Sequence, residues 1–141
     1  MCNFAMATVP PEMGKIRHVV VLSPRRRRNP GTYLIVPLST VAPNPIELYH
    51  YRIQANKYSF FKRNADIWVK GDMITNVSAA RLDRVLDNGQ YSSPILMAED
   101  FLSIQQAVLE ALGCGSSVQE TSMTVDVTET LRVIEVTSEE P

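Results

Sequence analysis

Only one stretch of this chain carries the apolar period of an amphipathic helix. That stretch runs from Ala98 to Leu112. Phe101, Ile104 and Val108 recur within it at helical spacing. Gly113 follows directly and is a natural helix stop. The chain therefore has one predicted helix, and the remaining apolar runs are short enough to be strands.

The segments before this helix are short and β-branched, and Pro and Gly separate them. Arg17 to Ser23 contains three consecutive valines bounded by Pro24, which predicts a buried strand. Thr32 to Leu38 predicts a second strand that pairs with the first as a hairpin. Further strands are predicted over residues 48–53, 68–77 and 84–86. Gly71 is expected to mark a bulge or a close backbone approach.

The length and composition bound the class of protein. A chain of 141 residues with 45% hydrophobic residues has room for one domain with its own core. No apolar run approaches the roughly 20 residues that span a bilayer, and residues 1–11 lack a signal-peptide pattern. Two cysteines, Cys2 and Cys114, make no disulfide framework. We therefore expect a cytoplasmic protein that is mainly β, with a terminal helix covering an open barrel end.

The charge is divided between two parts of the chain. Residues 1–113 hold 13 Lys and Arg against 9 Asp and Glu, a net charge of +4. Residues 114–141 hold one Arg against six acids, a net charge of −5, and are rich in Ser and Thr. A basic body suits a polyanionic partner. The tail is predicted to be extended or disordered, with a strand within residues 125–136 as the alternative. Its acidic residues could also compete in cis for the basic surface.

Three separated segments follow one another in a family-specific order. The first is Lys15 to Pro24 (KIRHVVVLSP), and the second is Val36 to Thr40 (VPLST). The third is Trp68 to Ile74 (WVKGDMI), with Arg81-Leu82 downstream and the helix last. In this order, over roughly residues 10–113, they resemble the MazF/PemK toxins of type II toxin–antitoxin systems. The motifs are similar to that family's RPVVVLSP strand, its VPLST strand end and its D-Q-[VI] strand.

The resemblance implies a fold, an activity and partners. The fold would be a small SH3-like β-barrel of the CcdB/MazF type, closed by the helix, in a domain over residues 1–113 followed by the tail. The activity would be metal-independent, cofactor-free and sequence-specific cleavage of single-stranded RNA, chiefly mRNA. The partners would be the RNA substrate, a cognate antitoxin and a second copy in a homodimer.

The same resemblance implies four catalytic residues. Arg17 matches the strand arginine that stabilises charge on the phosphate, and its planar fork suits two phosphate oxygens. Ser39 matches a strand-end hydroxyl that bonds the scissile phosphate, although a turn-forming serine is common there. Asp72 matches the general base of the PemK-type branch, and Lys70 would share its strand face. An ordinary ion pair is the structural alternative for these last two residues.

A wider set of residues is expected to contact RNA, because they match the family's RNA-contacting loop or form the basic turn and strand ends around it. They are Glu12, Lys15, His18, Arg25, Arg26, Arg27, Arg28 and Thr40. The arginine run is equally compatible with a solvated hairpin tip, and His18 with a surface strand position. No His/Cys cluster has metal-ligand spacing.

Two other functions remain open. One is a non-enzymatic toxin of the CcdB type that binds DNA gyrase on the same fold. That class lacks the strand arginine and hydroxyl pair, which are present here as Arg17 and Ser39. The other is a degenerate homologue that binds RNA without cutting it.

Overall fold

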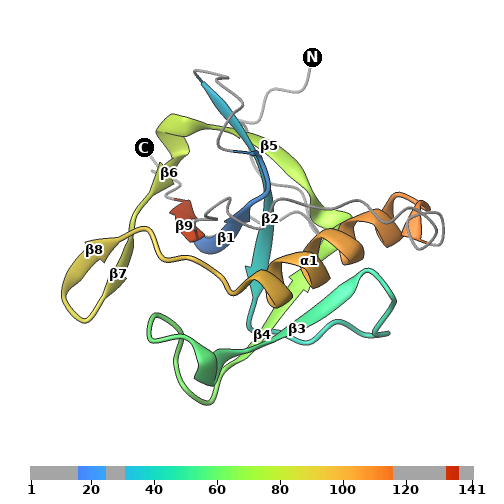
Figure 1. Ribbon diagram of the computed structural model, residues 1–141, viewed down its shortest axis with the longest axis horizontal. Coiled ribbons are helices and arrows are strands. Elements are labelled where there is room, and N and C mark those ends of the chain that lie inside the picture. The colour runs from blue at the N-terminus through green and yellow to red at the C-terminus, as the bar shows by residue number, and fades with distance from the viewer. Residues whose placement is uncertain (1–15, 25–30, 116–132, 137–141) are drawn as a thin grey trace.

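The computed structural model describes residues 16–24, 31–115 and 133–136, the last as a backbone strand. These residues form a strand-rich α+β structure with one α helix (Figure 1). The strands are β1 (Arg17–Val21), β2 (Thr32–Ser39), β3 (His50–Gln54), β4 (Asp66–Lys70), β5 (Thr75–Ser78), β6 (Leu82–Asp83), β7 (Val85–Asp87), β8 (Gln90–Ser92) and β9 (Val133–Val136). The helix is α1 (Ala98–Ala111), and the 3-10 turns are η1 (Ala55–Lys57), η2 (Gly71–Met73) and η3 (Ala79–Arg81). The predicted helix is thus confirmed to within a residue.

Seven strands form one sheet, in the order β3-β4-β2-β1-β9-β6, with β5 also pairing to β2. β7 and β8 form a separate hairpin, which lies apart from the sheet in Figure 1. β1 and β2 pair antiparallel, as the predicted hairpin requires. Among the described residues the strand pairing does not close into a barrel, so the expected closed barrel is not confirmed.

The strand predicted over residues 68–77 is wrong as a single element, because η2 divides it into β4 and β5. Both pieces pair with the same strand, β2. Continuing the β4 register would set Ile35 opposite Asp72, but Ile35 pairs with Thr75, three residues later. The extra residues form η2, which packs against α1. A Cβ on Gly71 would lie 2.6 Å from the Ala107 carbonyl oxygen, so the predicted close backbone approach is confirmed.

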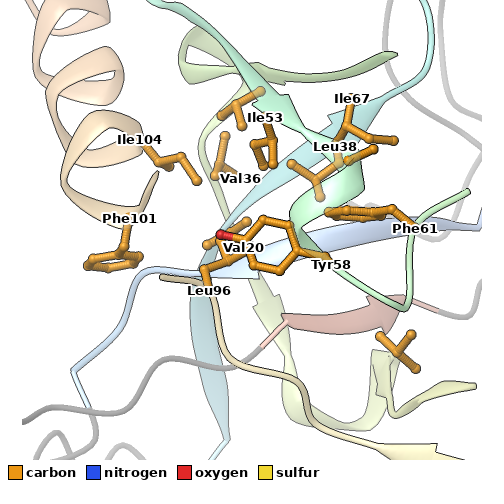
Figure 2. Close-up of a cluster of buried hydrophobic side chains, with 13 residues drawn as sticks. Val20, Val36, Leu38, Ile53, Tyr58, Phe61, Ile67, Leu96, Phe101 and Ile104 are labelled. Carbon is orange, nitrogen blue, oxygen red and sulfur yellow. The ribbon is translucent and has the colours of Figure 1, made fainter. Parts of the chain in front are cut away.

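The main core lies between α1 and one face of the sheet (Figure 2). Val20 and Val36 from the central strands meet Ile104 from the helix there. Ile53 and Val69 extend the same face across β3 and β4. A second, smaller cluster occupies the opposite face, formed by Val19, Val21 and Ile35 with Val77 and Leu82. The helix therefore covers only one face of the sheet.

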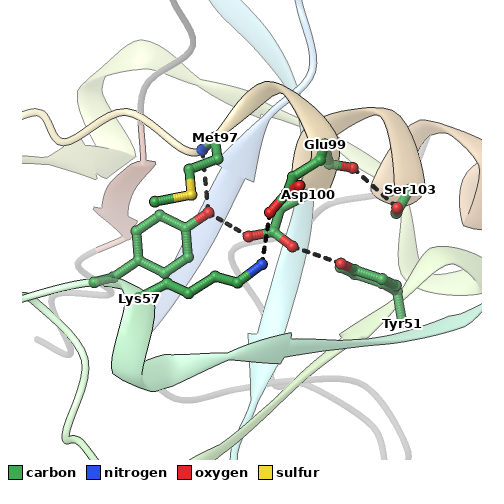
Figure 3. Close-up of polar contacts among 7 residues, drawn as sticks. Tyr51, Lys57, Met97, Glu99, Asp100 and Ser103 are labelled. Carbon is green, nitrogen blue, oxygen red and sulfur yellow. Dashed lines mark hydrogen bonds and ion pairs between the residues drawn. The ribbon is translucent and has the colours of Figure 1, made fainter.

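A buried carboxylate in the first turn fixes α1 to the sheet. Asp100 is 1% exposed and accepts a hydrogen bond of 2.5 Å from the Tyr51 hydroxyl (Figure 3). The Tyr58 hydroxyl donates to the other oxygen of Asp100 and accepts from the Met97 backbone N–H at 3.1 Å. Burial, and then the bond to Asp100, raise the pKa of both tyrosines. Lys57 adds an ion pair of 2.6 Å to Glu99 at the surface.

Part of the acidic tail belongs to the sheet. β9 pairs antiparallel with β1, setting Val136 opposite Arg17, and pairs with β6 on its other edge. The strand alternative for the tail therefore holds for residues 133–136. The rest of the tail lies outside the described residues.

Candidate functional site

Arg17 and Ser39 lie on one face of the sheet, the face that α1 does not cover. Val19 pairs with Pro37 across β1 and β2. Arg17 and Ser39 each lie two residues from that pair, and side chains two residues apart in a strand point to the same face. Continuing the register sets Arg17 opposite Ser39. The neighbouring Val20 points the other way, into the main core.

The same row continues over two further strands. Ser39 pairs with Trp68 on β4, and Trp68 pairs with Arg52 on β3. Arg17, Ser39, Trp68 and Arg52 therefore form one row across four strands, which we call the cross-strand row. Residues directly opposite in antiparallel strands have Cβ atoms about 5 Å apart. The row thus contains a hydroxyl, an indole N–H and two guanidinium groups.

Two hydrogen-bond donors in this row are buried without a partner. The Nε of Arg17 and the Nε1 of Trp68 have no hydrogen-bond partner within the part of the chain that the structure describes. Trp68 pairs with Ser39 directly, and the continued β1–β2 register places Arg17 on the other side of Ser39. Buried donors are nearly always paired in proteins, and an unpaired one calls for an explanation. An acceptor-rich ligand such as a phosphate would satisfy both.

Ser39 itself is 4% exposed and sits at the end of β2. Its Oγ accepts the Val41 backbone N–H at 3.1 Å and lies 3.3 Å from the Val41 carbonyl oxygen. The turn-forming role that the sequence left open is therefore present. The turn also holds the hydroxyl in the row, and its weak donation to the carbonyl can be exchanged for donation to a better acceptor.

Lys70 lies in the next row of the same face. It is two residues from Trp68 on β4 and directly opposite His50 on β3. Its position relative to Ser39 is diagonal, at roughly 7 Å. The site face thus carries three cationic side chains, from Arg17, Lys70 and Arg52.

Asp72 does not share a strand face with Lys70, contrary to expectation, because β4 ends at Lys70 and Asp72 lies in η2. Its half-exposed carboxylate is 4.0 Å from the Nε2 of His50, whose side chain is only 6% exposed. The Nδ1 of His50 accepts the Glu47 backbone N–H at 2.9 Å. The ring proton of a neutral His50 is then on Nε2, facing Asp72. Asp72 therefore lies close to His50, the residue opposite Lys70 on the site face.

The expected RNA-contacting residues divide into three groups. His18 points to the face under α1, where its ring packs edge-on against the Phe61 ring with the ring centroids 5.7 Å apart. It therefore lies on the opposite face of the sheet from Arg17. Thr40 is exposed directly after Ser39. The others lie outside the described residues: Glu12, Lys15, Arg25, Arg26, Arg27 and Arg28.

Among the described residues, no group of three or more His, Cys, Asp and Glu side chains could hold a metal ion. Nor does any described helix have the length and apolar character to cross a membrane.

Comparison with known proteins decides the family. Residues 1–112 match the family model of the PemK-like, MazF-like toxins of type II toxin–antitoxin systems. The chain belongs to this toxin family. It is 30% identical over 112 residues to an uncharacterized protein of Haemophilus influenzae. This alignment covers 77% of this chain and 76% of that protein. It is 32% identical over 115 residues to YifN, a putative uncharacterized protein of Escherichia coli K12. This alignment covers 78% of this chain and 75% of YifN.

Sequence reasoning about this toxin missed two members of the cross-strand row, Trp68 and Arg52. Both occupy alternate positions in strands whose other residues, Ile53 and Val69, face the main core. That alternation was visible in the sequence. The strand order that brings Trp68 and Arg52 beside Ser39 was not.

Proposed function

We propose that this toxin is a sequence-specific, metal-independent endoribonuclease that cleaves single-stranded RNA, chiefly mRNA. The observation that carries the proposal is the pair of buried donors, Arg17 Nε and Trp68 Nε1, which have no partner among the described residues and lie on either side of Ser39 when the β1–β2 register is continued. Their geometry suits a phosphate seated over the Ser39 hydroxyl. A gyrase-binding toxin has no need for such a cradle.

Cleavage would proceed by attack of the substrate's own 2′-hydroxyl on the adjacent phosphorus. The O2′–P bond forms, the P–O5′ bond breaks, and the products carry a 2′,3′-cyclic phosphate and a 5′-hydroxyl. Arg17 stabilises the charge that develops on the non-bridging oxygens, because its guanidinium is always charged and is already oriented by the sheet. Ser39 donates its hydroxyl to one of these oxygens.

Proton transfer is assigned to the other end of the site. Asp72 accepts the proton of the 2′-hydroxyl, since its carboxylate is half exposed and lies 4.0 Å from His50, the residue opposite Lys70. Lys70 lies on the same face as Ser39 and neutralises the phosphate. Arg17, which is close to the reacting phosphate, stabilises the negative charge on the departing 5′-oxygen; this oxygen takes up a proton from water, and Asp72 returns its proton to the solvent.

The toxin family implies an antitoxin partner. We further propose that the toxin acts as a homodimer in the cytoplasm, where mRNA is available, and that the antitoxin blocks the site face.

The test is cleavage of a mixed-sequence RNA by purified protein in the presence of EDTA. Arg17→Ala is expected to lower the rate about 100- to 1,000-fold, the effect of removing one oriented charge-stabilising donor. Arg17→Lys is expected to lower the cleavage rate nearly as much, because lysine keeps the charge but lacks the planar guanidinium fork. Arg84→Ala is the matched control, as it removes an exposed arginine beyond β6, at the opposite end of the strand order from β3. Melting temperatures close to wild type confirm that the variants fold.

Other outcomes would identify the competing functions. RNA binding without cleavage would assign the protein as a degenerate RNA-binding homologue. Inhibition of DNA gyrase without RNA cleavage would assign it as a CcdB-type poison. Cleavage that survives Arg17→Ala unchanged would reject the site proposed here.

A further inference from the structure

Trp68 is a buried aromatic residue on the face of the sheet that α1 does not cover. It is 8% exposed and, among the described residues, belongs to neither of the two hydrophobic clusters. Its indole N–H is a donor only, and it has no partner in the described parts of the chain. A buried Trp N–H usually finds an acceptor. The position of Trp68 beside Ser39 indicates that this acceptor comes from the ligand.

Arg52 is the next residue of the cross-strand row and lies on the edge strand β3. Its side chain is 62% exposed and forms an ion pair with Asp66, which is 53% exposed. Exposed ion pairs of this kind are weak. A phosphate, with its higher charge and geometry suited to the guanidinium fork, can therefore displace the Asp66 carboxylate.

Arg52 is too far from Arg17 to bind the same phosphate. The two residues are separated by three strand spacings, or roughly 14 Å across the sheet. A ligand that satisfies both arginines must carry successive phosphates, as a single-stranded nucleic acid does. Lys70 lies beside this path on the same face.

We propose that Trp68 and Arg52 extend the RNA site across β4 and β3. Trp68 donates its indole N–H to the RNA backbone next to the reacting phosphate. Arg52 releases Asp66 and binds a further phosphate of the same strand. This extension rests on the proposed RNA-cleaving function. It implies that the single-stranded RNA crosses the sheet at right angles to β2, toward β3.

The test measures binding of a fluorescent, mixed-sequence 2′-O-methyl RNA by anisotropy over a series of salt concentrations. This probe keeps the phosphates but lacks the attacking hydroxyl, so binding is measured without cleavage. Arg52→Ala is expected to weaken binding about tenfold and to reduce the slope of log K against log salt by about 0.7, the value for one phosphate on a single strand. Arg84→Ala, which removes the same charge at the other end of the sheet order, is expected to change neither.

Two more variants sharpen the result. Asp66→Asn is expected to tighten binding severalfold in the wild-type background and clearly less when Arg52 is already alanine, because only in the first case does it free Arg52 as well as remove a negative charge. Trp68→Phe is expected to weaken binding without changing the salt slope, because the lost donor is neutral.

The outcomes separate this inference from the function on which it rests. If wild-type protein cleaves RNA but Arg52→Ala behaves like Arg84→Ala, the extension is wrong and the proposed function stands. The extension is also wrong if Asp66→Asn tightens binding equally with and without Arg52. If wild-type protein neither binds nor cuts RNA, both proposals fall.

Discussion

Gly71 is the point at which the site strand meets the helix, and replacing it with alanine tests that junction. A Cβ at this position would lie 2.6 Å from the carbonyl oxygen of Ala107 in α1 and 2.9 Å from the carbonyl oxygen of Tyr49. Both are backbone atoms, so neither can rotate away. The Gly71 N–H also donates to Tyr49 at 2.8 Å, which fixes the loop from the other side. The clash can be relieved only by moving η2 away from the helix.

We expect Gly71→Ala to destabilise the protein by about 2 kcal/mol, in the range found for overpacked cores. For a domain of about 100 residues, that corresponds to a fall in melting temperature of roughly 10 °C. Because Asp72 follows directly in η2, the rate of RNA cleavage should fall as well, at temperatures where the variant remains folded.

Differential scanning calorimetry of Gly71→Ala and Gly31→Ala provides the assay and its control. Apart from its chain neighbours, no atom of the described residues lies within 4 Å of a Cβ on Gly31, so that variant should match or slightly exceed wild-type stability. A Gly71→Ala protein that melts with wild type would show that the helix does not hold η2 in the way described.

The remaining predictions concern the buried tyrosines and the tail. The raised pKa values of Tyr51 and Tyr58 mean that folding favours the neutral phenols. Their contribution to the free energy of unfolding is therefore fully present below pH 10.0, the ordinary tyrosine pKa, and is lost as the pH rises above it. Urea titrations between pH 8 and 11.5 should therefore show the free energy of unfolding falling at the alkaline end, less steeply in Tyr58→Phe; equal slopes would contradict this. Tyr58→Phe should itself cost about 1–3 kcal/mol near neutral pH, because Asp100 loses a donor and the Met97 N–H loses its acceptor. Deleting residues 133–141 should lower the melting temperature and promote aggregation, since it exposes the edges of β1 and β6, whereas deleting residues 137–141, which keeps β9, should lower it less.

The last of these predictions also changes how the acidic tail can be tested. Removing all of residues 114–141 would remove β9 from between β1 and β6. Any change in RNA binding would then mix lost charge with lost sheet structure. A test of competition between the tail and RNA must keep residues 133–136.

Local patterns were enough to predict the helix and the β1–β2 hairpin. Phe101, Ile104 and Val108 repeat at a helical period that tertiary packing has no reason to override. The β7–β8 hairpin was missed although the sequence carries a signal for it, the dipeptide Asn88-Gly89. In the structure both residues have positive φ, as the favoured two-residue hairpin turn requires. The break at η2 could be foreseen only as an irregularity at Gly71, because its size depends on where α1 packs.

The sequence pointed to individual residues of the proposed site but not to their arrangement. Motif order pointed to Arg17 and Ser39, and their placement on one face follows from the hairpin register. Which strand lies beyond Ser39 depends on the pairing of β2 with β4, a contact between segments about thirty residues apart. No local pattern encodes such pairing, so Trp68 and Arg52 were overlooked.

The central claim is that this fold uses the substrate's own 2′-hydroxyl to cut RNA on the face bearing Arg17 and Ser39. The most direct measurement is the chemistry of the RNA ends left after incubation with purified protein in EDTA. We predict a 2′,3′-cyclic phosphate on one fragment and a 5′-hydroxyl on the other, with both forming about 100- to 1,000-fold more slowly for Arg17→Ala. Fragments bearing 5′-phosphates, or intact RNA after incubation with the folded wild-type protein, would contradict the account.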